Sequence, residues 1–156
     1  MRIWLVNPPV IRERPSAVGA VVQSLFFNSP PLGLAYIAAV LERDGHRVRI
    51  TDCPVERLTI SDTADLARQY QPDLVGLTST TSYSDQAIET AQTLRRALPE
   101  ATLCLGGPHF NANPDLLLSQ PEFDFGVMGE GEFTLSEVVQ RIEAGRDYDD
   151  VAGVVT

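Results

Sequence analysis

Three apolar stretches of this chain each end abruptly at a loop of small or polar residues, and this pattern limits the possible folds. The stretches are residues 74–77, 103–105 and 125–128, and the loops that follow them are residues 78–82, 106–109 and 129–132. Short apolar runs bounded by turn residues are typical of strands buried on both faces. Such strands form parallel sheets, whose carboxyl ends share one edge where ligands bind.

The periodicity of the whole chain predicts five strands that alternate with five helices. We expect strands at residues 2–6, 47–51, 73–77, 101–105 and 123–128, and helices at residues 31–44 and 61–70 and starting near residues 85, 114 and 135. This alternation is typical of an α/β fold. The prediction is a doubly wound, five-stranded parallel sheet, Rossmann/flavodoxin-like, with strand order 2-1-3-4-5.

Three local expectations can be compared directly with a structure. The helix at residues 31–44 is apolar nearly all round, which predicts that it is mostly buried. Residues 82–85 and 134–137 match the capping box and predict helix starts there. Residues 151–156 begin an extended segment for which the sequence shows no partner strand.

Composition narrows the class of protein. A chain of 156 residues suits one domain, and the net charge of −9 argues against nucleic acid and against an anionic membrane surface as partners. The longest apolar stretch, residues 32–41, is about half a membrane span, and the amino-terminal apolar segment is too short for a signal peptide. Two cysteines without metal spacing fit a reducing compartment. We therefore expect a cytoplasmic protein.

The loop of five hydroxyl residues is a candidate binding loop, and the double glycine is a second one. Hydroxyls and free amides suit a ligand that carries amides or a phosphate, although Ser82 alone could cap the helix while the rest are solvated. Gly106 and Gly107 would let a bulky ligand approach the backbone. His109 could be a ligand or a base, but a lone loop histidine more often binds local backbone.

Two further segments leave their roles open. Glu130 and Glu132 could act as an acid/base pair, but the glycines around them favour a tight turn, with Glu130 as a hydrogen-bond acceptor and Glu132 at a helix start. Residues 10–30 show no clean period, so they form either a functional loop or a plain surface excursion.

Taken together, the motifs resemble a known family. They are Asn7-Pro8-Pro9, the run Pro30-Pro31-Leu32-Gly33-Leu34-Ala35-Tyr36-Ile37-Ala38, Gly45-His46-Arg47-Val48, the run from Pro72 to Ser79, Leu105-Gly106-Gly107-Pro108-His109, and Val127-Met128-Gly129-Glu130-Gly131-Glu132. In this order they resemble the N-terminal cobalamin (vitamin B12)-binding domain of cobalamin-dependent radical S-adenosylmethionine (SAM) enzymes. The resemblance covers roughly residues 1–145.

The resemblance implies a corrinoid across the carboxyl edge of the sheet, with its nucleotide tail beside the third-strand hydroxyls and the double glycine. The cofactor-binding residues that it implies are Asn7, Pro8, Pro9, Thr78, Ser79, Thr80, Thr81, Ser82, Gly106, Gly107, Pro108, His109, Gly129, Glu130 and Gly131. Asn7-Pro8-Pro9 and residues 10–30 are candidates for the lower side of the ring. No residue is expected to be catalytic or to bind a metal.

One departure from related proteins bears on the cobalt. Methionine synthase and the mutases carry Asp-x-His-x-x-Gly, whose histidine ligates cobalt from below, whereas Asp52 here is followed by Cys53 and Pro54. The resemblance therefore implies cobalamin bound base-off without a histidine ligand. It also implies a boundary: residues 1–145 form the cobalamin-binding domain, and residues 146–156 start a linker toward a radical SAM domain.

The catalytic machinery of the family is absent from this sequence. No CxxxCxxC cluster motif is present, so the resemblance implies that S-adenosylmethionine and a [4Fe-4S] cluster bind to another domain of the parent chain, and that this chain alone is not catalytic. The parent is expected to form a radical on a substrate carbon and usually to transfer a methyl group from methylcobalamin. Two alternatives are a flavodoxin-like module that binds a nucleotide or flavin, or serves for docking, and a domain that has lost its cofactor.

Overall fold

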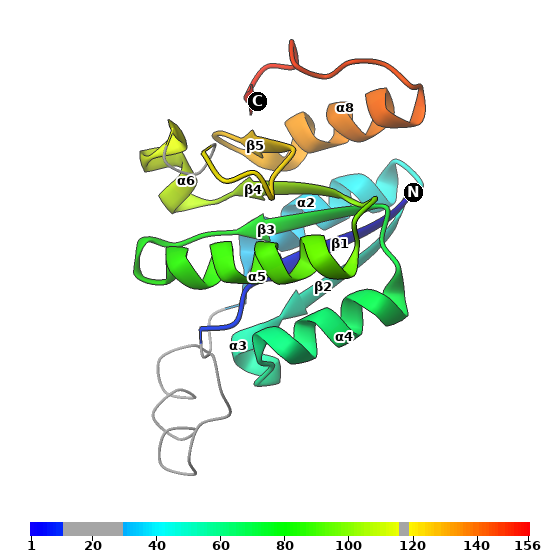
Figure 1. The fold of residues 1–156 in the computed structure, drawn as a ribbon. Helices are drawn as coiled ribbons and strands as arrows, with labels where there is room; N and C mark the ends of the chain where they lie inside the picture. The colour runs from blue at the N-terminus through cyan, green and yellow to red at the C-terminus, as the bar shows by residue number, and fades with distance from the viewer. Residues whose placement is uncertain (11–29, 116–118) are drawn as a thin grey trace.

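The computed structural model describes residues 1–10, 30–115 and 119–156 and shows one six-stranded sheet between two layers of helices (Figure 1). Most of the loop expected at residues 10–30 lies outside the described residues. The strands are β1 (Arg2–Asn7), β2 (Arg47–Asp52), β3 (Leu74–Thr78), β4 (Thr102–Gly106), β5 (Phe125–Val127) and β6 (Val154–Val155).

The order of the strands is β2-β1-β3-β4-β5-β6, so the predicted order 2-1-3-4-5 is confirmed for the parallel part. The register places Leu5 beside Gly76, and Gly76 beside Cys104. β6 pairs with β5 in the antiparallel direction, with Val154 beside Val127. The five parallel strands are therefore confirmed, and a sixth, antiparallel strand is added to them. The expectation that residues 151–156 lack a partner strand is wrong, because Val154 and Val155 pair with β5.

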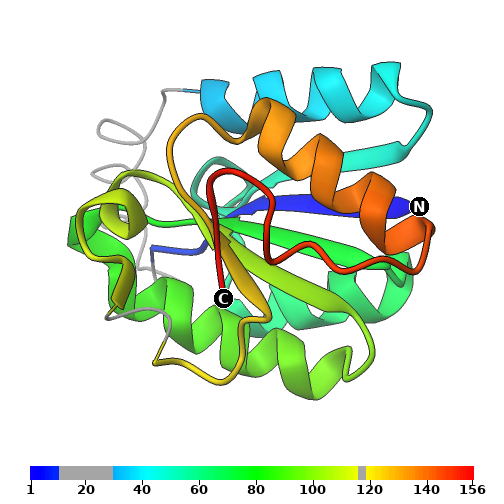
Figure 2. The same ribbon diagram turned by 90° about the horizontal axis from the view of Figure 1, so that it is seen from above.

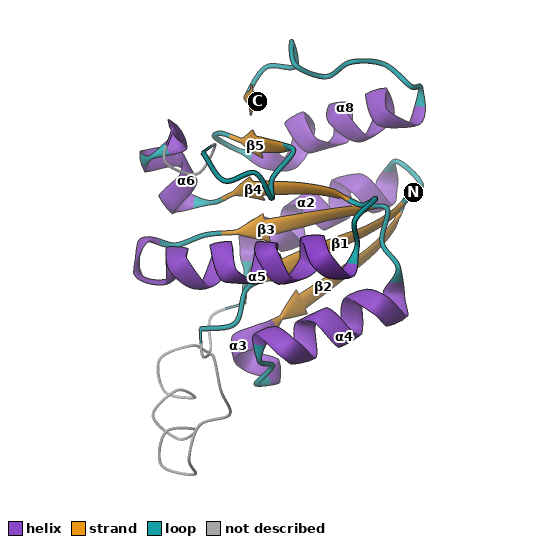
Figure 3. Cartoon of the chain, in the orientation of Figure 1, coloured by secondary structure: helices purple, strands orange, loops and turns teal. Residues whose placement is uncertain are grey.

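Helices cover both faces of the sheet (Figures 2 and 3). They are α2 (Leu32–Arg43), α3 (Cys53–Glu56), α4 (Ile60–Tyr70), η1 (Thr81–Tyr83), α5 (Ser84–Ala97), α6 (Pro108–Ala112) and α8 (Gly131–Glu143). α2 and α8 lie together on one face, and α3, α4 and α5 lie on the other. Alternate residues of β1 serve the two cores: Ile3 and Leu5 pack toward α2 and α8, while Trp4 and Val6 pack toward α4 and α5.

The helix starts differ from the expected capping boxes. α5 begins at Ser84 after the 3-10 turn η1, and α8 begins at Gly131, in both cases without a side-chain cap. Thr134 lies inside α8, where its hydroxyl donates to the carbonyl of Ala152 and so fastens the carboxyl-terminal segment. A capping box does form at α4, between Thr59 and Asp62. Both predicted boxes are wrong: η1 occupies residues 81–83, so α5 starts beyond Ser82, and the Thr134 hydroxyl makes a tertiary contact instead of capping α8.

The helix α2 is less buried than its composition predicts. Only Leu34, Ala38 and Leu41 are buried, whereas Leu32 and Tyr36 are 62% and 64% exposed. The expectation of a mostly buried helix is wrong because one face of α2 packs on the sheet and α8 while the other faces outward. Among the described helices, none is long and apolar enough to cross a membrane.

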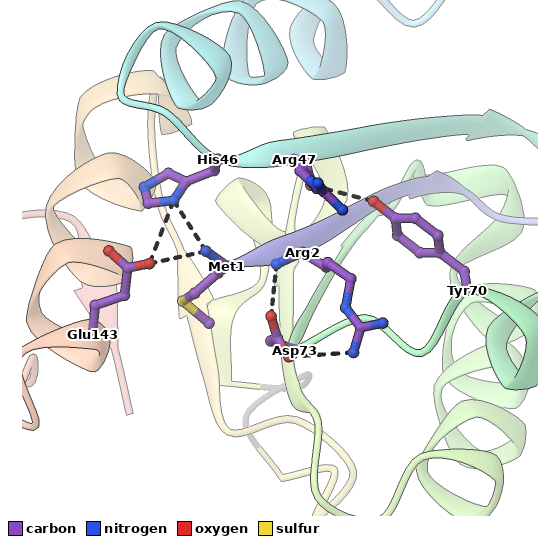
Figure 4. Close-up of polar contacts among 7 residues, drawn as sticks. All are labelled: Met1, Arg2, His46, Arg47, Tyr70, Asp73 and Glu143. Atoms are coloured by element: carbon purple, nitrogen blue, oxygen red, sulfur yellow. Dashed lines mark hydrogen bonds and ion pairs between the residues drawn. The ribbon is translucent and has the colours of Figure 1, made fainter.

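Polar contacts tie the helices to the amino edge of the sheet (Figure 4). The Met1 ammonium lies 2.9 Å from the Glu143 carboxylate and 3.4 Å from Nδ1 of His46. This hydrogen bond from the ammonium lowers the pKa of Glu143. Next to it, the backbone N–H of Arg2 donates to Asp73 at 2.6 Å. The start of β1 is thereby joined to the end of α8 and to the turn before β3.

A second polar group, centred on Arg95 of α5, fixes the turns that enter β4 and β5. Its guanidinium donates to the carbonyls of Ala101 and Glu122, each at 2.8 Å, and pairs with Asp124 at 2.7 Å. The same carboxylate oxygen accepts the backbone N–H of Leu103 at 2.7 Å. One side chain therefore satisfies two carbonyls and a carboxylate that would otherwise have to find water.

Replacing Arg95 by methionine should reduce the free energy of unfolding by about 2–3 kcal/mol, because the partners of a partly buried charge lose their donor while the aliphatic stem remains. Urea denaturation of the purified chain measures this loss. Arg96→Met is the matched control, since Arg96 is exposed and donates to the Thr93 hydroxyl, and should change stability by less than about 0.5 kcal/mol. Equal losses in the two variants would contradict this role.

Candidate functional site

A cavity of about 360 Å3 opens at the carboxyl edge of the sheet, on the side covered by α2 and α8. It is lined by residues from β1, β3, β4 and β5 and from the first turns of α2, α6 and α8: Leu5, Pro31, Gly33, Leu34, Ile37, Gly76, Leu77, Thr78, Cys104, Leu105, Gly106, Gly107, Pro108, Asn111, Val127, Gly129, Glu130, Gly131, Glu132 and Leu135. The three predicted strand ends therefore meet at one site, as expected for a parallel sheet.

The floor and the rim of this cavity differ in polarity. The buried floor includes Leu5, Cys104 and Leu135, which are at most 3% exposed and belong to the core under α2 and α8. Burial raises the pKa of the Cys104 thiol to about 12, so this side chain is neutral and behaves as a small apolar group. The exposed or half-buried polar side chains, such as Thr78 and Glu130, form the rim. The arrangement suits a ligand with one apolar end and a polar remainder.

The five predicted hydroxyls have different roles. Thr78 lines the cavity, whereas Ser79 is buried and donates its backbone N–H and its hydroxyl to the carbonyl of Gly106, at 2.9 and 3.2 Å. Thr80 precedes η1, and Thr80, Thr81 and Ser82 are exposed beyond the cavity. Of this loop only Thr78 is thus placed to touch a ligand inside the cavity.

Gly107 has a role that the sequence did not indicate. Its φ is +98°, and a Cβ atom there would lie 2.5 Å from Oγ1 of Thr78 and 2.8 Å from the backbone nitrogen and oxygen of Ser79. The chain's own β3 loop, rather than a ligand, therefore occupies the space that the missing side chain leaves. Gly106 is less constrained, because its Cβ would meet only the carbonyl oxygen of Val127, at 3.4 Å.

His109 lies on α6, not in a loop as expected, and it does not line the cavity. The residue is 7% exposed, its backbone N–H donates to the carbonyl of Ser79, and its Nδ1 lies 3.3 Å from the Thr81 hydroxyl. The neighbouring Pro108 does line the cavity. His109 thus joins α6 to the β3 loop, in line with the local role favoured from the sequence.

Asn7, Pro8 and Pro9 lie at the carboxyl end of β1 and are not among the described cavity residues. Both prolines are buried, and the Asn7 amide donates to the Asp52 carboxylate at 2.9 Å. Asp52 is followed by the buried Cys53, whose thiol pKa is raised to about 12 chiefly by burial. The contact joins the ends of β1 and β2 beside the cavity.

The turn before α8 forms the third wall. Gly129, at φ +75°, Glu130 and Gly131 all line the cavity, and Glu132 lies in the first turn of α8 as expected. The side-chain oxygen of Asn111 accepts the backbone N–H of Gly129 at 2.9 Å and so joins α6 to this turn.

Asn111 and Gly33 are cavity residues that the sequence analysis missed as site residues. Asn111 follows the double glycine by four positions, which puts it one helical turn into α6. Gly33 lies in the first turn of α2, where a Cβ atom would meet nothing within 4 Å. Glycine disfavours a helix, so a glycine in a predicted helix beside the ligand-binding edge of the sheet is the signal that could have identified this residue.

The chain has two histidines in all, and neither lines the cavity. His46 lies at the opposite, amino edge of the sheet beside Met1 and Glu143 (Figure 4). Within the described ranges, no group of three or more His, Cys, Asp or Glu residues is placed to hold a metal ion.

Comparison with known proteins assigns the chain to a family. The family model of the B12 binding domain matches residues 18–139, which is most of the chain. The chain belongs to the B12-binding domain family. The resemblance expected from the sequence motifs is confirmed at this level, and the cavity lies where this fold class binds its ligands.

Relatives and solved structures agree with this assignment. The chain is 37% identical to the uncharacterized methyltransferase PH0819 of Pyrococcus horikoshii, over 99% of its own length and 32% of that protein. It is 31% identical to the anaerobic magnesium-protoporphyrin IX monomethyl ester cyclase of Synechocystis, over 99% of its length and 30% of the cyclase. The fold matches the radical SAM methyltransferase TsrM of Kitasatospora setae, solved with cobalamin and a [4Fe-4S] cluster, with a TM-score of 0.77 at 24% identity, covering 98% of this chain and 26% of TsrM.

Gly107→Ala should reduce the free energy of unfolding by about 2–4 kcal/mol even without any ligand, because the new methyl group meets the β3 loop at a strained positive φ. Gly106→Ala is the neighbouring control and should cost less than about 1 kcal/mol. Urea denaturation of both variants tests the difference. Similar stability of the two variants would show that Gly107 is not held by the β3 loop.

Asn111→Ala should speed hydrogen exchange at the Gly129 amide and reduce stability by about 1 kcal/mol, because that N–H loses its acceptor. Asn111→Asp should restore slow exchange, since a carboxylate oxygen can accept the same hydrogen bond. Exchange monitored by NMR reads this amide directly. Unchanged protection in the alanine variant would mean that the turn before α8 is held by other contacts.

Proposed function

We propose that this chain binds cobalamin at the carboxyl edge of its sheet, as the cofactor module of a larger radical SAM enzyme. The observation that carries the proposal is the cavity with an apolar floor and a polar rim, formed by the three strand ends of a B12-binding domain. When bound, cobalamin supplies the organometallic chemistry of methyl transfer, and the protein supplies position and axial environment.

The size of the cavity decides which part of cobalamin it can hold. At about 360 Å3 it is at the small end of ligand pockets, which span about 300–1,000 Å3. The corrin ring with its rim of amides is too large and too polar for it. The flat aromatic base at the end of the nucleotide tail matches the apolar floor, so the ring would lie outside, across the edge of the sheet.

The rim offers partners for the rest of the tail. Thr78 presents a hydroxyl and Asn111 an amide beside the cavity, and Gly33 and Gly129 leave open space where a side chain would stand. Ribose, phosphate and amide groups can hydrogen-bond to such donors. The chain's residues therefore fit the cofactor that the family implies.

The positions of the two histidines support cobalamin bound base-off and without a histidine ligand. His46 lies at the far edge of the sheet, and His109 is 7% exposed, with its Nδ1 3.3 Å from the Thr81 hydroxyl. With the benzimidazole base in the cavity, the base is drawn away from the cobalt. Asn7, Pro8 and Pro9 then remain candidates for the lower side of the ring.

The rest of the parent enzyme is proposed from its relatives. The chain spans about a third of the length of the relatives that it matches. We propose that the remainder of a parent chain holds S-adenosylmethionine and a [4Fe-4S] cluster, with residues near 146–156 leading to that domain. Relatives named as methyltransferases favour methyl transfer. The two free, buried cysteines fit a cytoplasmic home.

The test is to mix the purified chain with hydroxocobalamin and follow gel filtration and the absorption spectrum. We expect the corrinoid to co-elute with the protein and to show the base-off spectrum. After reduction to Co(II), the electron paramagnetic resonance lines should show no splitting by an axial nitrogen.

His109→Ala is the control that distinguishes the histidine-free site from a ligated one. Its spectrum with cobalamin should equal that of the unchanged chain. A nitrogen splitting that disappears in His109→Ala would refute the absence of a histidine ligand, and failure of cobalamin to co-elute at micromolar concentrations would refute the proposed function.

A further inference from the structure

We propose that the cavity also selects among corrinoids by their lower base, accepting an apolar benzimidazole in preference to a purine. This inference rests on the proposed function, because it assigns the base of the bound corrinoid to the cavity. The argument depends on the floor of the cavity, on its rim and on one open position in α2.

The floor offers no strong hydrogen-bonding group in the part of the chain that the structure describes. The side chains of Leu5, Leu34 and Leu135 on this face of the sheet are buried, and the polar atom among them is the neutral thiol of Cys104. The backbone groups of β3 and β4 are taken up by the parallel pairing of these strands. A group that needs a hydrogen bond would be left without a partner there.

The two kinds of base differ in the groups that would enter the floor. Dimethylbenzimidazole carries two methyl groups on the ring that points away from the ribose, and these gain from burial in an apolar pocket. Adenine carries ring nitrogens and an exocyclic amine at the corresponding end. Those groups would leave water and find only leucine side chains and a thiol.

The rim cannot compensate for this difference. Its acceptors and donors belong to residues such as Glu130, Glu132 and Thr78, which are exposed or half-buried and stand at the mouth. The Asn111 side-chain oxygen is already occupied by the Gly129 N–H. Apolar pockets discriminate by about 10- to 200-fold for a single methylene group. We therefore expect about a tenfold or greater preference for the benzimidazole corrinoid.

The experiment measures dissociation constants of the chain for three corrinoids by absorption titration. They are cobalamin, the analogous cobamide with adenine as its base, and cobinamide, which lacks the nucleotide and the base. Cobalamin should bind at least tenfold more tightly than the adenine cobamide. Equal affinity for these two would overturn the inference while leaving cobalamin binding intact, whereas failure of all three to bind would overturn both proposals.

A variant in α2 locates the selectivity in the cavity. Gly33→Leu places a side chain at the cavity wall where nothing lies within 4 Å of the Cβ position, and leucine favours the helix more than glycine does. We expect this variant to bind cobalamin and the adenine cobamide with the same affinity, close to that of cobinamide. Its free energy of unfolding, measured by urea denaturation, should be no lower than that of the unchanged chain, which separates a filled cavity from a damaged fold.

Ala39→Leu is the matched control, because it adds the same side chain at an exposed position of the same helix that does not line the cavity. Its preference for cobalamin should equal that of the unchanged chain. Retention of the full preference in Gly33→Leu would overturn the assignment of the base to this cavity.

Discussion

The segments that follow β3 and β4 are in direct backbone contact, and the site depends on this contact. The Ser79 N–H donates to the Gly106 carbonyl at 2.9 Å, and the Ser79 carbonyl accepts the His109 N–H at 3.1 Å. These two segments can approach so closely only because Gly107 lacks a side chain and adopts a positive φ. This contact extends the connection between β3 and β4 beyond the last paired residues of these strands and sets the direction of α6. One wall of the cavity is therefore fixed before any ligand is bound.

The fold could be predicted from the sequence because burial on both faces leaves a strong pattern. Residues 74–77 and 103–105 could only be central strands, and the helical periods between the strands dictated parallel connections. The short strand β6 could not be foreseen, because the pairing of Val154 with Val127 depends on where the chain returns after α8. The outward face of α2 was missed for a similar reason: the apolar residue Leu32 is exposed despite its type.

The site was predicted in outline, and the roles within it were not. Seven of the fifteen cofactor-binding residues that the resemblance implies line the cavity: Thr78, Gly106, Gly107, Pro108, Gly129, Glu130 and Gly131. Composition indicated small and polar residues at the edge, but it could not separate a glycine that makes room for the protein from one that leaves room for a ligand. Gly107 is of the first kind and Gly33 of the second. The distinction depends on contacts between segments far apart in the sequence.

The polar contacts at the amino edge also bear on the spacing of the two helices beside the cavity. Glu143 at the end of α8 is held by Met1, and the Asp44 carboxylate after α2 accepts a hydrogen bond from Ser136 of α8 at 2.5 Å. Both fastenings lie away from the cavity, which opens between the first turns of these two helices. The spacing of α2 and α8 beside the cavity is therefore set by polar contacts of side chains that do not themselves line it.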